Sequence, residues 1–162
     1  MIITRLYEDR DFQDLCRLCQ GVVEYYQVGE IPDANRTEIY VREKVLGNDS
    51  DVSVMMAFDS DKGVGLASFS IMYPSPNLNG QLYLKELYVD EKYRGKGAGQ
   101  ALMKAVARYA LEHNCNRMDW SAEKTNPPAL EFYRAIGAKP LDVKVYYRFS
   151  DSDLVSFAES DR

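Results

Sequence analysis

Apolar residues recur at helical spacing in the first part of the chain, after a short apolar segment at 2–7 that is typical of a strand. Asp11 precedes the helical pattern and is expected to cap it. The apolar positions of this pattern are Phe12, Leu15, Cys16, Cys19, Val22, Val23 and Tyr26. Residues 29–33 contain a glycine and a proline and predict a loop. A second, more polar helix is expected over 34–46 and ends at Gly47.

The period changes to two in the middle of the chain. Apolar positions alternate over 52–58 and predict a strand, followed by a turn at 59–63. A second strand is expected over 64–73. A loop with two prolines at 74–80 then leads to a third strand at 81–89. Three strands joined by short turns predict a meander.

Helices and strands mix in the last part of the chain. The pattern predicts a helix at about 98–113, a strand over 117–122 and a last strand over 143–149. Between these strands, Asn126 followed by two prolines starts a short helix, and Gly137 ends it. The order of elements predicts an α+β fold around one mixed sheet.

The length of 162 residues fits one domain, expected over 1–150, followed by a polar, acidic and loosely held tail over 151–162. A net charge of −5 keeps the protein soluble, disfavours a nucleic-acid partner and suits a cationic small molecule. No apolar run reaches the roughly 18 residues of a membrane span. The N-terminus does not resemble a signal peptide, so we expect a cytoplasmic protein without a membrane partner.

Three cysteines and one histidine offer little metal chemistry. Cys16 and Cys19 are spaced as C-x-x-C but lie in a helical pattern without a second pair. We therefore expect both to be small buried residues on a helix face. Cys115 stands alone. His113 falls at a helix end, where a cation suits the dipole. We therefore predict no metal site and no Ser-His-Asp triad.

A basic, glycine-rich turn over Arg94–Gly99 joins the strand at 81–89 directly to the following helix. Unpaired N–H groups at a helix start, approached closely through glycines, predict an anion site. The spacing fits neither a P-loop nor a dinucleotide fingerprint. It does fit R-x-x-G-x-G, as Arg94, Gly97 and Gly99.

A second segment carries Asn126, Ala129, Phe132-Tyr133 and Gly137. With the glycine turn, it resembles the GNAT superfamily of N-acetyltransferases over about residues 3–149. This resemblance implies a single mixed, mostly antiparallel, splayed sheet flanked by about four helices. It further implies acetyl-CoA as co-substrate, no metal, and a homodimer.

The resemblance also implies how the co-substrate is held. Backbone groups of Leu87 and Val89 would pair with the pantetheine arm, and the Leu87 N–H would stabilise the oxyanion. The turn would bind pyrophosphate, with Arg94 and Lys96 adding charge unless they are only solvated surface cations. The implied cofactor-binding residues are Leu87, Tyr88, Val89, Arg94, Gly95, Lys96, Gly97, Ala98, Gly99, Gln100 and Asn126. For Asn126, a helix cap is the alternative.

Two side chains are implied as catalytic. Tyr133 would act as general acid toward the departing sulfur, or else pack in the core beside Phe132. Glu86 would deprotonate the amine, directly or through water, or else face solvent or pair with Lys85. Many enzymes of this kind manage without a single base.

The sequence says less about the acceptor amine than about the co-substrate. The segment from Asp119 to Tyr133 is similar to the diamine and polyamine branch, but Lys85 stands where that branch carries a second acidic residue. Acidic and aromatic side chains at Glu24, Tyr25 and Tyr26 could hold a cationic amine, or simply lie on the surface. A small primary amine is the expected acceptor. Peptide N-termini, protein lysines, and a non-catalytic acyl-CoA-binding role remain alternatives.

Overall fold

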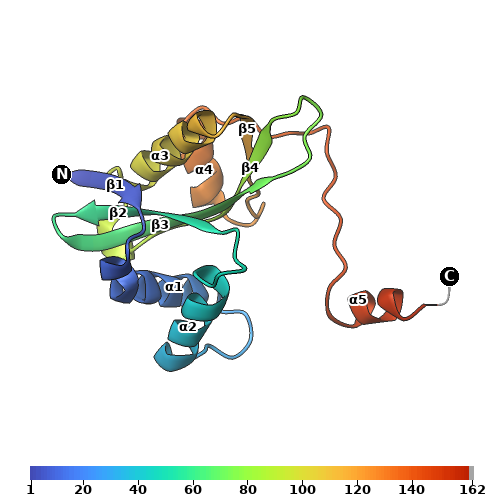
Figure 1. Cartoon of the computed structure of the whole chain (residues 1–162), viewed down its shortest axis with the longest axis horizontal. Helices are drawn as coiled ribbons and strands as arrows, with labels where there is room; N and C mark the ends of the chain where they lie inside the picture. Colours follow the sequence, from blue (N-terminus) through green and yellow to red (C-terminus); the bar gives the residue numbers. More distant parts are fainter. Residues whose placement is uncertain (161–162) are drawn as a thin grey trace. The chain divides into compact units, whose positions relative to one another are not determined.

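A five-stranded sheet with strand order β1-β2-β3-β4-β5 forms the centre of the first of two units in the computed structural model, which describes residues 1–160 (Figure 1). The first unit is Met1–Ser121, and the second begins at Ala122. The strands are β1 (Ile2–Leu6), β2 (Ser53–Asp59), β3 (Lys62–Met72), β4 (Gly80–Val89) and β5 (Cys115–Asp119). Neighbouring strands from β1 to β4 are antiparallel, and β5 is parallel to β4. The prediction of a mixed, mostly antiparallel sheet is confirmed.

Helices cover both faces of this sheet, with α1 and α2 on one face and α3 on the other (Figure 1). The helices of the first unit are α1 (Phe12–Tyr26), α2 (Ala34–Tyr40), its π-helical continuation η2 (Val41–Val45) and α3 (Ala98–Glu112). Two 3-10 turns, η1 (Asp9–Asp11) and η3 (Glu91–Tyr93), lead into α1 and toward α3. All three expected helices of this unit are present.

Asp11 plays a different part from the expected cap. It precedes α1, but its side chain makes no capping hydrogen bond to that helix. Instead the buried carboxylate accepts hydrogen bonds of 2.5 and 2.8 Å from Arg5 and one of 2.8 Å from the Glu8 N–H. The Arg5 guanidinium lowers the pKa of Asp11. A buried charge needs such a partner, so the Asp11 carboxylate binds Arg5 of β1 and not the first backbone amides of α1.

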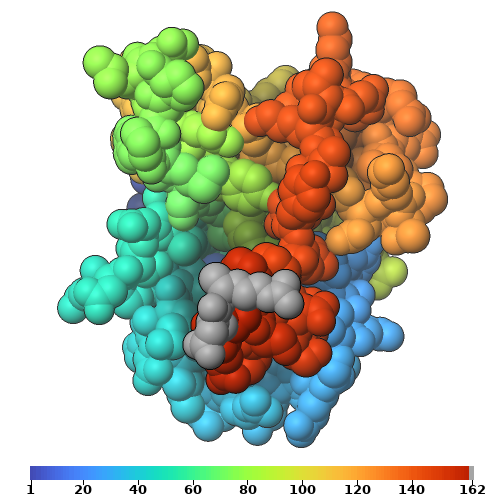
Figure 2. Space-filling view, turned by 90° about the vertical axis from the view of Figure 1, so that its right-hand side faces the viewer, coloured from blue at the N-terminus to red at the C-terminus, as the bar shows by residue number. Residues whose placement is uncertain are grey.

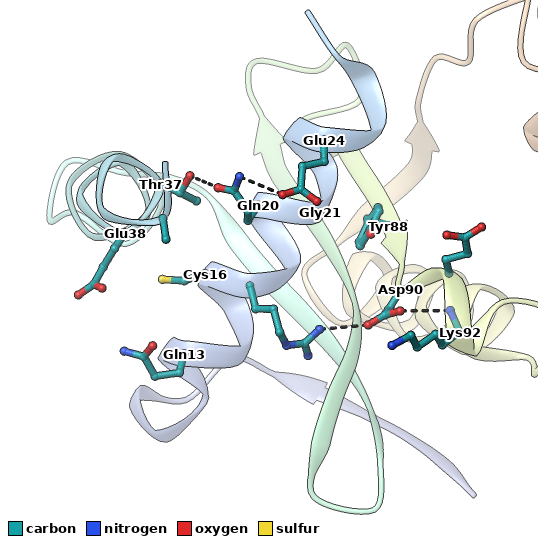
Figure 3. A pocket seen from close by; sticks show the side chains of 13 residues that line it. Gln13, Cys16, Gln20, Gly21, Glu24, Thr37, Glu38, Tyr88, Asp90 and Lys92 are labelled. Carbon is teal, nitrogen blue, oxygen red and sulfur yellow. Dashed lines mark hydrogen bonds and ion pairs between the residues drawn. The ribbon is translucent and has the colours of Figure 1, made fainter. Parts of the chain in front are cut away.

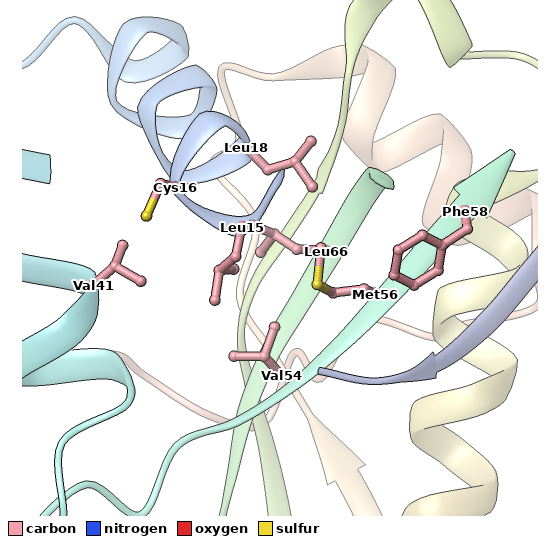
Figure 4. Packing of buried hydrophobic residues seen from close by; sticks show 8 residues of the cluster. All are labelled: Leu15, Cys16, Leu18, Val41, Val54, Met56, Phe58 and Leu66. Atoms are coloured by element: carbon pink, nitrogen blue, oxygen red, sulfur yellow. The ribbon is translucent and has the colours of Figure 1, made fainter. Parts of the chain in front are cut away.

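The first unit has an apolar layer on each face of its sheet. Side chains of α1, η2, β2 and β3 pack together in one layer (Figure 4): Leu15, Cys16, Leu18, Val41, Val54, Met56, Phe58 and Leu66. On the other face, Phe69 of β3 meets the ring of Tyr109 of α3 with centroids 5.0 Å apart. Leu102 and Val106 of α3 are fully buried. The alternation of strand residues therefore serves two layers, as a sheet covered on both faces requires.

A β-bulge at Lys85 changes which side chains of β4 meet which layer. Leu84 pairs with Phe69 and Glu86 with Ser68, so Lys85 has no partner on β3. Leu84 shares the α3 face with Phe69. Without the extra residue, Glu86 would share that face too; instead it turns toward α1.

The second unit contains α4 (Pro127–Ala135) and α5 (Asp151–Ala158). Asn126 caps α4, because its side-chain oxygen accepts a 3.4 Å hydrogen bond from the Ala129 N–H. Gly137 adopts a φ of +88° just after the helix, and the Ala138 N–H bonds back to the Tyr133 carbonyl. This pattern is a Schellman motif, which explains the glycine.

The strand predicted over 143–149 is wrong, because these residues form no strand. The polar, acidic tail contains α5, a fifth α-helix among residues 1–160. A strand requires a neighbouring edge for its ladder, and the five strands of the described sheet do not include this segment. Val143 is 90% and Tyr147 is 85% exposed in this segment, which Figure 2 draws in orange-red.

Candidate active site

The edge of β4 that faces β5 is paired over only part of its length. The ladder between the two strands runs from Gly80↔Cys115 to Tyr83↔Asp119, where β5 ends. Residues 84–89 of β4 are therefore paired only with β3 within the described sheet. The two strands part at Tyr83, which gives the splayed sheet that the resemblance implied.

Hydrogen-bond alternation shows which backbone groups face this open edge. The Asp90 N–H donates to the Val64 carbonyl across 2.9 Å, so this pair is of the hydrogen-bonded kind. In an antiparallel ladder such pairs alternate with pairs whose N–H and C=O groups point away from each other. Leu87 and Val89 belong to the second kind, so their backbone groups point to the open edge. The Val89 carbonyl accepts a 3.0 Å bond from Arg94 Nε.

The glycine turn continues directly from the open edge. Gly95 and Gly97 have φ values of +74° and +87°, a region that most L-residues avoid. A side-chain carbon added at either glycine would meet nothing within 4 Å, so the turn presents bare backbone. Gly97 is the N-cap of α3, whose first amides have no partner inside the helix. Gly99 and Gln100 lie in this first turn, and Ala98 is buried beneath it.

Three cations contact three aromatic rings at and beside the turn. The Arg94 guanidinium lies 5.5 Å from the ring centroid of Tyr25 and 5.9 Å from that of Tyr88. Lys96 lies 4.9 Å from the Tyr93 ring, and Lys62 approaches the same ring at 5.6 Å. The positive charge adds to the positive end of the α3 dipole. The turn can therefore bind a polyanion.

Glu86 lies half-buried on the α1 side of β4. Its carboxylate accepts a 3.2 Å hydrogen bond from the Tyr26 hydroxyl. Burial raises the pKa of Glu86, while the Tyr26 hydroxyl, the charge of the exposed Lys85 and the Leu87 N–H lower it in part. Desolvation makes a carboxylate a stronger base than in water. The predicted base, the predicted oxyanion donor and Tyr26 thus lie together.

The three expected acceptor residues have different surroundings. Tyr26 contacts Glu86, and Tyr25 contacts Tyr26 edge-on at 5.4 Å as well as Arg94. Glu24 instead lines a cleft of about 540 Å³ that α1, α2, η3 and the end of β4 enclose (Figure 3). Gln20, itself bonded by Thr37, donates a 3.2 Å hydrogen bond to Glu24.

This cleft carries more acid than base. Four carboxylates line it, from Glu24, Glu38, Asp90 and Glu91, against the cations of Arg17 and Lys92. Asp90 is paired with Arg17 at 3.1 Å. The remaining charge is negative and suits a cation.

Sequence reasoning missed Arg17, Asp90 and Gly21. Arg17 bonds Asp14, Asp90 and the Gly63 carbonyl, and so ties α1 to the end of β4 over a separation of 73 residues that no local pattern reveals. Gly21 did give a signal, because glycine inside a helix usually has a packing reason. A side-chain carbon there would collide with the Tyr88 hydroxyl.

Tyr133 and Asn126 belong to the second unit. Tyr133 lies half-buried on α4, with its ring centroid 5.3 Å from that of Phe132. Asn126 uses its side-chain oxygen to cap α4. Their roles toward the first unit stay predictions.

The cysteines carry no apparent chemistry. Cys16 is buried, as predicted, whereas Cys19, for which burial was also predicted, is half-buried; Cys115 is buried as well. Burial raises the pKa of Cys19 to about 12, so its thiol stays protonated. Within residues 1–160, no group of three His, Cys, Asp or Glu side chains could hold a metal ion. Among the helices of the same residues, none combines the length and apolar character that a membrane crossing needs.

A model of the acetyltransferase (GNAT) family matches residues 15–138. The chain belongs to this family. The GNAT resemblance and the prediction of an N-acetyltransferase are confirmed, because several relatives are named as such enzymes. GNAT enzymes of this kind take their acetyl group from acetyl-CoA.

Two curated relatives of this chain are acetyltransferases named for different amines. Thialysine N-epsilon-acetyltransferase of Bos taurus is 23% identical over 152 residues, which cover 86% of this chain and 85% of that protein. Spermine/spermidine N(1)-acetyltransferase of Bacillus subtilis is 32% identical over 77 residues, covering 46% of this chain and 51% of that protein.

Solved structures share the fold. The integron cassette protein VCH_CASS6, from the mobile metagenome of V. cholerae, superimposes with a TM-score of 0.90 at 38% identity over 98% of both chains. Aminoglycoside N-acetyltransferase AAC(6')-Iy in complex with CoA superimposes with a TM-score of 0.73 at 17% identity, over 92% of this chain and 95% of that one.

Proposed function

We propose that this protein moves an acetyl group from acetyl-CoA to the primary amine of a small cationic molecule. One observation carries the proposal: the unpaired edge of β4 over residues 84–89 leads directly into the glycine turn at the start of α3. An extended chain with amides can pair along such an edge, and its pyrophosphate can bind at a helix N-terminus. Coenzyme A has both parts in this order.

The first unit fits the co-substrate by its chemistry. The outward backbone groups of Leu87 and Val89 would bond the pantetheine amides, and the bare backbone of Gly95 and Gly97 would admit the pyrophosphate. Acetyl-CoA supplies an activated thioester. Arg94 would exchange its contact with the Val89 carbonyl for a phosphate, since a charge-assisted bond is the stronger one.

Glu86 is the proposed base. Its carboxylate lies beside the amide proposed to stabilise the oxyanion, so an amine that donates to Glu86 would lie near the reacting carbonyl. An N–H donor aimed at the developing oxyanion contributes about 3 kcal/mol. Tyr133 is the proposed general acid toward the leaving thiolate, by analogy with the family.

The acceptor proposal rests on charge and on the relatives. The cleft beside Glu24 has an excess of carboxylates, which favours a substrate with a second positive group. The two curated relatives are named for thialysine and for spermine and spermidine, which are amines. Lys85 is exposed at the bulge and would repel a long polyamine along that side. We therefore favour a compact di-cationic amine.

Cytoplasmic location and a homodimer remain predictions, as do two other roles. A peptide N-terminus or protein lysine would serve as acceptor if the site admitted a polypeptide. A non-catalytic acyl-CoA-binding module would bind acyl-CoA at the open edge of β4 but would not transfer the acyl group.

A thiol-release assay with acetyl-CoA tests the proposal. The acceptor panel contains diamines, polyamines, basic amino acids, aminoglycosides and short peptides, and the product is identified by mass spectrometry. We expect N-acetylation of small amines with two positive groups. Turnover of peptides alone would replace the acceptor class. Acetyl-CoA binding without turnover of any acceptor would favour the binding module, and an absence of acetyl-CoA binding would contradict the proposal altogether.

A further inference from the structure

Arg17 of α1 bonds to oxygen atoms from separate parts of the first unit. Its guanidinium donates hydrogen bonds of 2.8 Å to Asp14 and 3.1 Å to Asp90, and a further one to the Gly63 carbonyl. Asp14 precedes it in α1, Gly63 lies at the start of β3, and Asp90 directly follows β4. A planar guanidinium can serve several acceptors at once, whereas an ammonium acts as a point charge. Arg17 therefore joins α1, the β2–β3 turn and the end of β4.

The Asp14 carboxylate holds the same β2–β3 turn from α1. It accepts a 2.8 Å hydrogen bond from the Gly63 N–H, while Arg17 bonds the carbonyl of that residue. A side-chain carbon at Gly63 would lie 2.9 Å from the Asp14 Cβ, so glycine permits this close approach. The preceding residue, Lys62, places its ammonium 5.6 Å from the centroid of the Tyr93 ring in η3. The turn that α1 holds therefore also contacts η3.

Asp90 connects Arg17 with the segment that leads into the glycine turn. Asp90 is the N-cap of η3, and its carboxylate accepts a 3.1 Å hydrogen bond from the Lys92 N–H (Figure 3). Its backbone is bonded as well, to the Val64 carbonyl at 2.9 Å and to the Tyr93 N–H at 2.8 Å. One carboxylate oxygen thus holds η3 while the other holds Arg17.

The glycine turn begins where η3 ends. η3 has three residues, and its C-cap is Arg94. The Arg94 N–H donates a 3.2 Å hydrogen bond to the Glu91 carbonyl. A 3-10 turn of this length has few hydrogen bonds of its own, so its orientation depends on what holds its first residues. The direction in which the chain runs from β4 into Gly95 and Gly97 is therefore set by Asp90.

We infer that Arg17 is a positioning residue for acetyl-CoA: by fixing Asp90, it holds η3 and the glycine turn in the orientation that binds the pyrophosphate. The inference rests on the proposed binding of acetyl-CoA at this turn. The side chains of Arg17 and Asp90 are 39% and 21% exposed, so the pair is partly shielded from solvent and salt. Arg17 acts through Asp90 and not as a ligand of the phosphates.

Simple charge attraction makes a different prediction for one of the two partners. Acetyl-CoA is a polyanion, so charge alone would make its binding weaker without the Arg17 cation and stronger without the Asp90 anion. Positioning requires both residues, so the loss of either should weaken binding. Asp90→Asn separates the two explanations. Asparagine has one side-chain oxygen, which can cap η3 but cannot hold Arg17 at the same time as a carboxylate does.

Calorimetric titration with acetyl-CoA, in the absence of an amine, measures the effect. Arg17→Gln and Asp90→Asn should each raise the Kd about fivefold. The double variant should bind no more weakly than either single variant, because both changes break the same contact. Arg17→Lys should recover part of the affinity. Arg10→Gln is the control for the loss of one cation, because its 2.8 Å ion pair with Glu8 joins two residues that precede α1, and it should leave the Kd unchanged.

The outcomes separate this inference from the proposed function. Wild-type binding with an unchanged Kd in Arg17→Gln overturns the inference and leaves the proposed function standing. Tighter binding in Asp90→Asn also overturns it, because charge and not position then governs the affinity. A wild-type protein that does not bind acetyl-CoA contradicts the proposed function, and the inference with it.

Limited digestion with trypsin tests the positioning without acetyl-CoA, and does so even if Arg17→Gln fails to fold. Trypsin cleaves after Lys92, Arg94 and Lys96, which lie in η3 and the glycine turn. Cleavage at these sites should be several times faster in Asp90→Asn than in wild type, while cleavage after Arg42 of η2 should keep its rate. Equal rates at the turn would overturn the inference. An equal acceleration at every site would do so too, because the pair would then serve general stability.

Discussion

The Tyr26 hydroxyl donates a 3.2 Å hydrogen bond to the Glu86 carboxylate, across 60 residues of sequence. The bond joins the last residue of α1 to the residue that follows the bulge in β4. It favours the ionised carboxylate, whereas burial favours the neutral acid and raises the pKa. Tyr26 thus tunes the proposed base as well as flanking the proposed acceptor.

Replacing Tyr26 by phenylalanine should move the acidic limb of the pH–rate profile to higher pH. The change removes a contact that lowers the pKa of Glu86, so the carboxylate should ionise at a higher pH. The measurement is kcat/KM for the amine against pH at saturating acetyl-CoA. Tyr40→Phe, at an exposed tyrosine of α2, should leave the limb in place. An unmoved limb in Tyr26→Phe would show that Glu86 does not limit the rate.

Gly97→Ala should weaken acetyl-CoA binding through the backbone. Alanine at a φ of +87° costs about 1–2 kcal/mol, so the turn should relax away from its anion-binding form. The KM for acetyl-CoA should rise roughly tenfold, a change of about 1.4 kcal/mol. Gly29→Ala is the matched control, because Gly29 also has a positive φ and open surroundings but lies between α1 and α2. Equal KM changes in both variants would exclude a specific role for the turn.

Gly21→Ala should destabilise the fold, although alanine in a helix interior normally stabilises by about 1 kcal/mol. The added carbon would collide with the Tyr88 hydroxyl and lie 2.8 Å from its ring carbon Cζ. Overpacking of this kind costs about 1–3 kcal/mol, measurable by urea unfolding. Tyr88→Phe should recover part of the loss in the double variant. Stability above wild type for Gly21→Ala would mean that Tyr88 moves aside freely.

Asp11→Asn should lower the free energy of unfolding by about 3 kcal/mol near pH 7, because Arg5 loses its charged partner. The pKa of Asp11 is below its ordinary 3.8, so its contribution is present above that pH and is lost as the pH falls through the folded-state pKa. The gap between variant and wild type should therefore narrow in strong acid. Asp59→Asn, at a more exposed ion pair, should change stability little. A gap independent of pH would assign the effect to packing.

Tyr133→Phe should reduce kcat by about 10²-fold or more while acetyl-CoA still binds, because the leaving thiolate loses its proton donor. Tyr146→Phe, at an exposed tyrosine between α4 and α5, is the control. Steady-state kinetics with each accepted amine, together with equilibrium binding of acetyl-CoA, separate the two effects. Unchanged turnover with intact binding would remove Tyr133 from the mechanism.

Local patterns were sufficient for most of the fold. The period of the apolar positions placed α1, α3 and the β2–β4 meander, because each element buries its own apolar stripe. The same reasoning predicted a strand over 143–149 that the structure does not contain. An alternating pattern indicates only that a segment favours the strand conformation. Whether a strand forms also depends on a free sheet edge with which it can pair.

The candidate site was only partly visible in the sequence. The glycine turn can be recognised in the sequence, because its positive φ angles and exposed backbone require glycine at fixed positions. Contacts between distant residues do not: neither the Arg17–Asp90 pair nor the Tyr26–Glu86 bond leaves a local trace. Charge and aromatic content suggested Tyr26 as an acceptor residue, yet its contact with the proposed base needed coordinates.

The extra residue at Lys85 reverses which side chains of β4 face each side of the sheet. Upstream of it, even-numbered side chains of β4 face α3; downstream, even-numbered side chains face α1. A one-residue deletion would place a carboxylate in an apolar layer and turn a leucine toward the acceptor side. An alignment of this strand must therefore be counted backward from Val89, because counting forward from Gly80 assigns every later residue to the wrong face.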